Sequence, residues 1–216
     1  MQVSKFNMEK FLTIPIVGIV RNISLHDLKA ILPIYQQVGL TTIEITMNTP
    51  HADQLIGYAN EHFGESLNVG AGTVCDAHDL EMALAAGATF IVTPILDQEV
   101  IKLCVQKNIP IFPGAYTPTE IYTAWKLGAT MVKIYPATAL GSVYIKELKA
   151  PLNGLKVLPT GGVSLANMAD FFQCGADGVG IGGQLFDQKL IEAQDWAGLE
   201  AHFRAFVAQL KPNNRA

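Results

Sequence analysis

Eight short apolar segments recur along the chain, and amphipathic segments separate them. The apolar segments cover residues 14–21, 42–48, 68–74, 90–94, 110–114, 131–136, 156–162 and 178–183. Runs of this length, rich in Val and Ile, are typical of strands buried on both faces of a parallel sheet. The alternation predicts an α/β fold built from successive βα units.

The amphipathic segments predict the helices that connect these strands. Most of them follow a Ser, Thr or Asp that can cap a helix N-terminus, and several stop at a glycine suited to the position after a helix. The clearest examples cover residues 24–38, 76–86, 97–107, 117–127 and 164–174. We also expect a helix ahead of the first strand.

A weak internal repeat favours a closed barrel over an open sheet. A glycine, one small or apolar residue and then Thr or Asp precede every second strand, beginning at Gly39, Gly87, Gly128 and Gly175. An open doubly wound sheet does not need this even-strand regularity, although glycine also ends helices in other folds. We therefore predict one (β/α)8 TIM barrel, with an N-terminal helix, that spans residues 1–216 as a single domain.

The composition excludes several classes of protein. Half of the 216 residues are apolar and 16% are charged, which suits a large core without a linker. Disorder is expected only at Lys211–Ala216. A net charge of −4, with scattered Lys and Arg, provides no basic surface for nucleic acid.

No segment predicts export or a membrane anchor. The first residues, MQVSKFNMEKFL, lack the apolar core of a signal peptide, and no run approaches the roughly 18 apolar residues of a membrane span. Cys75, Cys104 and Cys174 are odd in number and lack CxxC spacing. We therefore expect free thiols and a cytoplasmic protein.

Polar side chains gather near the carboxyl ends of the expected strands, where (β/α)8 barrels carry their functional groups. They are Arg21, Glu44, Thr46, Asn48, Thr73, Lys133 and Thr160. Alternation with a period of two places Glu44, Thr46 and Asn48 on one side of their strand and leaves the intervening apolar residues for the helices. Because Lys133 can point inward in the same way, Glu44 and Lys133 are predicted to share the barrel interior.

The lysine in the segment MVKIYPA, residues 131–137, is not explained by packing. Burying an ammonium group is costly and lowers the pKa of the amine, and the neutral amine is the form that attacks a carbonyl. Lys133 is therefore a candidate for Schiff-base formation, with Glu44 as a proton shuttle. The alternative is a buried ion pair with a purely structural role.

Two diglycine loops predict a phosphate subsite. Gly161 and Gly162 end the seventh expected strand, and Gly182 and Gly183 end the eighth. Backbone N–H groups of these loops, together with a short helix N-terminus, commonly bind phosphate in barrels of this kind, although a diglycine is also a common tight turn. The five histidines lie in or beside expected helices without ligand spacing, so we expect no metal site.

Eight motifs in this order resemble one family of enzymes. They are GIVR, GLTTIEITMNTP, VGAGTV, FIVTP, FPGAYTPTE, VKIYPA, LPTGGV and GIGG. From about Met8 to Leu210, the chain resembles the 2-dehydro-3-deoxy-phosphogluconate aldolases and the related 4-hydroxy-2-oxoglutarate and 2-dehydro-3-deoxy-6-phosphogalactonate aldolases. The resemblance implies a class I aldolase that needs no metal or other cofactor and is typically a homotrimer.

The resemblance also implies roles for individual residues. Lys133 would form the Schiff base, Glu44 would be the catalytic carboxylate, and Thr73 and Thr160 would contact the pyruvyl group. Further substrate contacts are expected from Pro94, Tyr135, Gly161, Gly162, Gly182 and Gly183.

Two departures from the family pattern affect the substrate-binding residues. Some members carry an arginine where this chain has Asn48, so Arg21 is our candidate for binding the substrate carboxylate. Gly183 stands where members commonly have serine, which removes a hydroxyl donor to phosphate.

These residues predict reversible cleavage of 2-dehydro-3-deoxy-6-phosphogluconate, a phosphorylated keto acid, to pyruvate and D-glyceraldehyde 3-phosphate. The galactonate epimer and unphosphorylated 4-hydroxy-2-oxoglutarate are the alternative substrates. A phosphate-binding isomerase and a non-catalytic ligand-binding barrel are the alternatives outside the aldolases.

Overall fold

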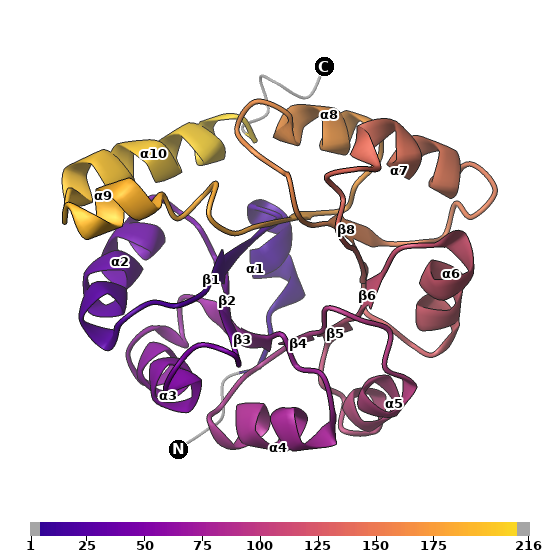
Figure 1. Ribbon diagram of the computed structural model, residues 1–216, viewed down its shortest axis with the longest axis horizontal. Coiled ribbons are helices and arrows are strands. Elements are labelled where there is room, and N and C mark those ends of the chain that lie inside the picture. The colour runs from indigo at the N-terminus through magenta and orange to yellow at the C-terminus, as the bar shows by residue number, and fades with distance from the viewer. Residues whose placement is uncertain (1–4, 211–216) are drawn as a thin grey trace.

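Parallel strands curl into a barrel that a ring of helices surrounds (Figure 1). The computed structural model describes residues 5–210, so the disorder expected at Lys211–Ala216 lies outside the described residues. The strands are β1 Ile16–Val20, β2 Thr42–Thr46, β3 Asn68–Gly72, β4 Ile91–Val92, β5 Ile111–Phe112, β6 Gly114–Ala115, β7 Val132–Ile134, β8 Val157–Pro159 and β9 Val179–Ile181. Every one of them overlaps a predicted strand.

Two hydrogen-bonded ladders, all parallel, make up the barrel. Their orders are β5-β4-β3-β2-β1-β9 and β6-β7-β8. The chain itself joins them between β5 and β6, where Pro113 lacks an N–H group and interrupts the ladder. On the other side, Thr160 forms a parallel bridge with Gly180 of β9. Since β5 and β6 together form the strand predicted at 110–114, the predicted (β/α)8 barrel is confirmed.

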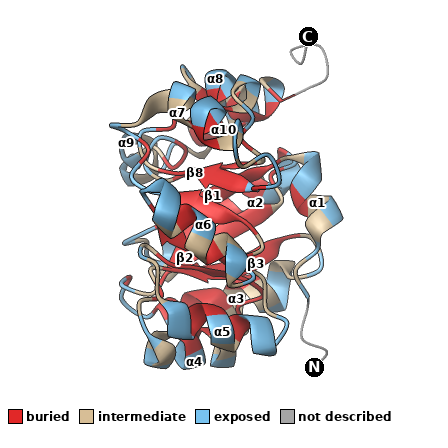
Figure 2. Ribbon diagram, turned by 90° about the vertical axis from the view of Figure 1, so that its right-hand side faces the viewer, coloured by how far each residue is buried: buried red, intermediate tan, exposed pale blue. Residues whose placement is uncertain are grey.

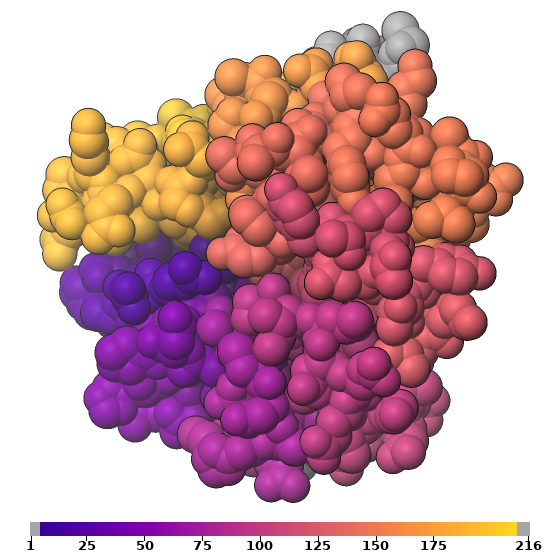
Figure 3. Space-filling view, turned by 45° about the vertical axis from the view of Figure 1, so that its right-hand side comes forward, coloured from indigo at the N-terminus to yellow at the C-terminus, as the bar shows by residue number. Residues whose placement is uncertain are grey.

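The helices lie outside the strands, except for α1. They are α1 Met8–Thr13, α2 Leu25–Gln37, α3 Ala52–Phe63, α4 Ala77–Ala85, α5 Gln98–Gln106, α6 Pro118–Lys126, α7 Gly141–Lys149, α8 Met168–Gln173, α9 Gln188–Glu192 and α10 Trp196–Ala208. The C-terminal helix α10 packs beside α2, which brings the two ends of the ring together (Figures 1 and 3).

Local chemistry explains where four of the helices end. The four glycines of the sequence repeat, Gly39, Gly87, Gly128 and Gly175, adopt φ values of 93°, 95°, 101° and 96°. They end α2, α4, α6 and α8 as the repeat predicts, because glycine enters the left-handed region without a steric penalty.

One helix begins later than its sequence pattern predicts. The sequence pattern predicts a helix over 164–174, but α8 starts at Met168. The Asn167 side chain accepts a hydrogen bond from Ser164 N–H (2.8 Å) and donates one to the Gly162 carbonyl (2.9 Å). These two bonds hold residues 162–167 in a turn, so the predicted start was wrong.

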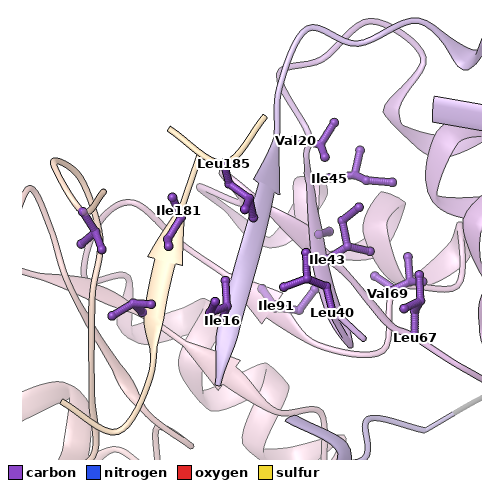
Figure 4. Close-up of a cluster of buried hydrophobic side chains, with 14 of the residues drawn as sticks. Ile16, Val20, Leu40, Ile43, Ile45, Leu67, Val69, Ile91, Ile181 and Leu185 are labelled. Atoms are coloured by element: carbon purple, nitrogen blue, oxygen red, sulfur yellow. The ribbon is translucent and has the colours of Figure 1, made fainter. Parts of the chain in front are cut away.

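Buried residues lie in the strands and on the inward faces of the helices (Figure 2), and the apolar ones form two layers. The larger layer lies between strands and helices and includes Ile16, Val20, Ile43 and Ile45 (Figure 4). Outward residues of the strands supply it, as a period of two requires.

The smaller layer fills the inside of the barrel, toward the amino ends of the strands. Phe90 and Phe112 pack there with ring centroids 5.5 Å apart, and Phe11 of α1 joins them. Asn7, at the start of α1, exchanges hydrogen bonds of 2.8 and 3.0 Å with the side chain of Asn68, the first residue of β3. The expected N-terminal helix therefore closes the barrel at the amino ends of the strands. Within residues 5–210, no helix has the length and apolar character needed to cross a membrane.

Candidate active site

Lys133 lies in the middle of β7 and points into the barrel. Its neighbours in register are Gly114 and Leu158, and its backbone N–H donates to the Pro113 carbonyl at 2.9 Å. The residue is only 6% exposed. Its Nζ lies 5.0 Å from the centroid of the Tyr135 ring. The backbone around this amine is therefore fixed by ladders on both sides.

Glu44 lies on β2, in the six-stranded ladder, and is 1% exposed. Neither carboxylate oxygen has a hydrogen-bond partner among the described residues. The carboxyl group lies so close to Gly72 of β3 that a methyl group there would overlap it. A buried carboxyl group without a partner is rare in proteins and is often found at functional sites.

Lys133 and Glu44 share the interior without forming a direct ion pair. The ion pairs among residues 5–210 are Lys149–Asp177 (2.9 Å) and Arg204–Glu200 (2.6 Å), and both lie outside the barrel interior. The structural alternative, a buried Lys–Glu ion pair in contact, is therefore not formed. The two groups still interact through their charges.

Burial shifts the ionisation of both groups. Burial lowers the pKa of Lys133, the charge of Glu44 opposes this shift, and the charge of Arg21 adds to it. Burial likewise raises the pKa of Glu44, against the opposite effects of Lys133 and Arg21. The result favours a neutral amine, which is the nucleophilic form, beside a carboxyl group that can exchange protons.

A cavity of about 700 Å³ opens at the carboxyl ends of β1, β8 and β9. Seven of the predicted substrate contacts line it: Arg21, Tyr135, Thr160, Gly161, Gly162, Gly182 and Gly183. Tyr135 also neighbours the Lys133 amine, which links the cavity to the barrel interior. Predictions made from separate strands therefore converge on one place.

The two glycine loops provide unpaired donors to this cavity. Gly161 and Gly162 adopt φ values of 90° and 75°. The backbone N–H groups of Gly161, Gly162 and Gly183 donate to no acceptor within the described part of the chain. Such groups can bind an anion. Because α8 begins only at Met168, the loop supplies these donors, and the helix N-terminus predicted beside it does not.

Thr73 and Pro94 lie on neighbouring strand exits and are not in the wall of this cavity. Thr73 follows β3 with φ 55°, a strained conformation for a β-branched residue, and such strain is often found at functional sites. The Pro94 carbonyl packs against Gly114, the register partner of Lys133. Thr73 directly follows Gly72, which lies against the Glu44 carboxyl group, so both residues adjoin the strands next to the interior pair.

Sequence reasoning missed part of the cavity wall. The missed side chains come from the start of α2 and from the segment around α9, and include Asn22, Asp27, Gln184, Gln188, Glu192 and Gln194. The helix α9 has only five residues, which is too short to give a readable periodicity. The close approach of Gly72 to Glu44 was also missed, although the glycine-rich motif VGAGTV was a signal for it.

A sequence model of the KDPG and KHG aldolase family matches residues 8–202. The chain belongs to the KDPG and KHG aldolase family. It is 34% identical over 174 residues to the 2-dehydro-3-deoxy-6-phosphogalactonate aldolase of Escherichia coli K12, covering 80% of this chain and 85% of the relative. It is 34% identical over 191 residues to the 2-dehydro-3-deoxy-phosphogluconate aldolase of Haemophilus influenzae, covering 88% and 89%.

Solved structures agree with this assignment. A native KDPGal structure has a TM-score of 0.84 and 30% identity, and the match covers 95% of this chain and 98% of that one. Members of the KDPG and KHG aldolase family are lyases, and so is this chain.

Proposed function

We propose that the chain is a class I aldolase that reversibly cleaves 2-dehydro-3-deoxy-6-phosphogluconate to pyruvate and D-glyceraldehyde 3-phosphate. One observation carries the proposal: Lys133 is buried in the interior with a lowered pKa and makes no direct ion pair with Glu44. An amine in this state is suited to covalent chemistry with a ketone.

The reaction begins when the neutral amine of Lys133 attacks the C2 carbonyl of the keto acid. Loss of water gives a cationic imine, which accepts electrons as the C3–C4 bond breaks. Glu44 takes the proton from the C4 hydroxyl, directly or through a water molecule, and the aldehyde leaves. The same proton then returns to C3 of the enamine, and hydrolysis of the imine releases pyruvate and Lys133.

The two ends of the substrate are held by different groups. Arg21 binds the carboxylate, and Thr73 and Thr160 contact the pyruvyl part, with Pro94 and Tyr135 beside it. Backbone N–H groups of Gly161, Gly162, Gly182 and Gly183 bind the phosphate. Two anchors fix the bond that breaks relative to Lys133 and Glu44.

The proposal also states which epimer of the phosphorylated keto acid the enzyme prefers. One relative is named for the phosphogalactonate substrate and another for phosphogluconate, at the same 34% identity. Values of kcat/KM for the two epimers and for 4-hydroxy-2-oxoglutarate, measured side by side, decide between them. A preference for either alternative substrate would overturn the choice of phosphogluconate and leave the aldolase mechanism in place.

Trapping of the covalent intermediate tests the mechanism. The protein is incubated with pyruvate and borohydride, digested, and mapped by mass spectrometry. We expect one pyruvate adduct, at Lys133, and none in Lys133→Met. Lys149→Met is a matched control, because Lys149 is a half-buried lysine paired with Asp177 outside the barrel interior. An adduct elsewhere, or none with an active enzyme, would refute the proposal.

We further propose a homotrimer, as the family resemblance implies. Support comes from large apolar side chains at the surface, among them Ile95, Tyr116 and Val143, which are 52%, 38% and 61% exposed. Light scattering after gel filtration measures the mass directly. A monomeric mass at micromolar concentration would contradict the proposal.

A further inference from the structure

Buried threonine hydroxyls join the exits of β1 and β2. The side-chain oxygens of Thr46 and Thr49 lie 3.0 Å apart, and Thr49 Oγ1 also accepts a hydrogen bond of 3.1 Å from the backbone N–H of Asn22. Thr46 is fully buried and Thr49 is 3% exposed. The site already described uses neither hydroxyl.

Thr49 is itself held firmly by the turn that follows β2. Its N–H donates to the Thr46 carbonyl at 2.9 Å, and its own carbonyl accepts from the N–H of Ala52 in α3 at 3.1 Å. Thr46 lies two residues beyond Glu44 on the same inward face of β2. The hydroxyl of Thr49 is therefore fixed relative to the strand that carries Glu44.

The partner of Thr49 lies where β1 has already ended. The strand stops at Val20, and Asn22 takes a left-handed φ of 52° as the chain turns toward α2. Arg21, between them, has an exposed side chain in the cavity wall. Beyond the strand, the bond from Asn22 to Thr49 joins this turn to the turn that follows β2.

We infer that Thr49 is a positioning residue that fixes where the Arg21 guanidinium meets the substrate carboxylate, relative to Glu44 and Lys133. This inference rests on the proposed function, in which Arg21 binds that carboxylate. The charge of Arg21 lowers the pKa of both Glu44 and Lys133, so the position of this guanidinium also affects the two interior groups. Loss of the Thr49 hydroxyl should therefore weaken binding of the keto acid more than it slows the chemical step.

Steady-state kinetics of Thr49→Val test this. Valine keeps the shape and removes the hydroxyl, so we expect KM for the keto acid to rise about tenfold, within the roughly hundredfold that a displacement of about 1 Å can cost. The value of kcat should change by less than about threefold. The pyruvate concentration for half-maximal borohydride trapping should rise by the same factor as KM. In Thr49→Ser, which keeps the hydroxyl, KM and the pyruvate concentration for half-maximal trapping should stay at the values of the unmodified protein.

A matched control separates positioning from general loss of stability. Thr89, just before β4, is 5% exposed and donates a hydrogen bond of 2.9 Å to the carbonyl of Val69 in β3, and neither residue lies in the cavity wall. Thr89→Val removes a buried hydroxyl in the same way and should leave KM unchanged. If Thr49→Val does not fold, judged by circular dichroism, Thr49→Ala removes the same hydroxyl and takes its place.

A double-mutant cycle with Arg21→Met completes the test. If Thr49 acts through Arg21, Thr49→Val causes no further rise of KM in the Arg21→Met background. An unchanged KM in Thr49→Val would overturn the inference, as would an equal rise in Thr89→Val or full additivity in the cycle. Absence of a Lys133 adduct in the unmodified protein would instead refute the proposed function, so the two failures are distinguishable.

Discussion

Gly72→Ala should disable the site by moving Glu44. The added Cβ would lie 2.5 Å from Cγ of Glu44 and closer still to its carboxyl carbon and Oε1, whereas ordinary Cβ contacts begin near 3.4 Å. The strand β3 is fixed by its ladders to β2 and β4, so the side chain must give way. Gly72 has no positive φ, so alanine causes no strain in the backbone itself.

The size of the effect follows from this displacement. The carboxyl group must move by about 1 Å, and a misplacement of that size can cost about a hundredfold in rate. We therefore expect kcat to fall about 100-fold, which corresponds to about 2.7 kcal/mol in the activation free energy. Binding of pyruvate by Lys133 should change much less, because the lysine lies on the other ladder.

The assay measures pyruvate release from the phosphorylated keto acid, with thermal unfolding as the parallel measurement. Gly70→Ala is the matched control, since its Cβ would meet the Phe90 ring, with Cδ1 at 2.5 Å, instead of the carboxyl group of Glu44. This control should lose stability with a smaller loss of kcat. In Glu44→Ala the space is free, so adding Gly72→Ala to that variant should cost no stability and lower kcat no further.

Two results would refute the reasoning. One is a Gly72→Ala enzyme whose kcat stays within about threefold of the unmodified enzyme, which would mean that the position of Glu44 does not matter. The other is a further loss of kcat when Gly72→Ala is added to Glu44→Ala, which would mean that Gly72 acts by another route.

Three further predictions follow from the burial of single side chains. First, imine formation with pyruvate should become faster as pH rises, with a midpoint below 10.5, the ordinary pKa of lysine, because burial lowers the pKa of Lys133. In Glu44→Gln the midpoint should move to lower pH, because the carboxylate charge raises that pKa, and a shift to higher pH would contradict the assignment. Second, between the lowered pKa of native Lys133 and 10.5, the unfolded chain binds a proton that native Lys133 does not. Over this pH range Lys133 should therefore make the free energy of unfolding rise with pH, by as much as about 1.4 kcal/mol per pH unit. Urea unfolding of Lys133→Met should lack this component, and equal pH slopes in the two proteins would argue against the shifted pKa. Third, Phe90→Ala should cost about 3–5 kcal/mol and lower Tm by about 6–20 °C, because Phe90 is fully buried against Phe6 and Phe112. A loss below about 1 kcal/mol in calorimetry would mean that the aromatic layer is not tightly packed.

The sequence predicted the barrel well because its signals are local. Apolar runs mark the strands, and a left-handed glycine ends α2, α4, α6 and α8. The boundaries that failed depend on particular side chains. Pro113 divides one expected strand into β5 and β6, and the Asn167 side chain delays the start of α8. A hydrophobic pattern shows neither effect. Pro113 has no N–H group to donate to the ladder, and Asn167 adds side-chain hydrogen bonds that hold the turn before α8.

The candidate site could be predicted in part for the same reason. Period-two alternation places Glu44 and Lys133 inside, where the structure has them. The hydrogen bond from the Asn22 N–H to the Thr49 hydroxyl could not be predicted, because it joins two strand exits that are 27 residues apart in the sequence. The far cavity wall around α9 escaped prediction because five residues give no periodicity.

The division of the barrel into two ladders has a mechanical consequence. Lys133 belongs to the three-stranded ladder and Glu44 to the six-stranded one. Hydrogen bonds also cross the seams between the ladders: the Thr130 N–H donates to the Ile111 carbonyl at 3.0 Å, and the Asp177 N–H donates to the Val157 carbonyl at 3.0 Å, on the same side as the bridge between Thr160 and Gly180. The distance between the amine and the carboxyl group therefore depends on the contacts at these seams as well as on the two ladders.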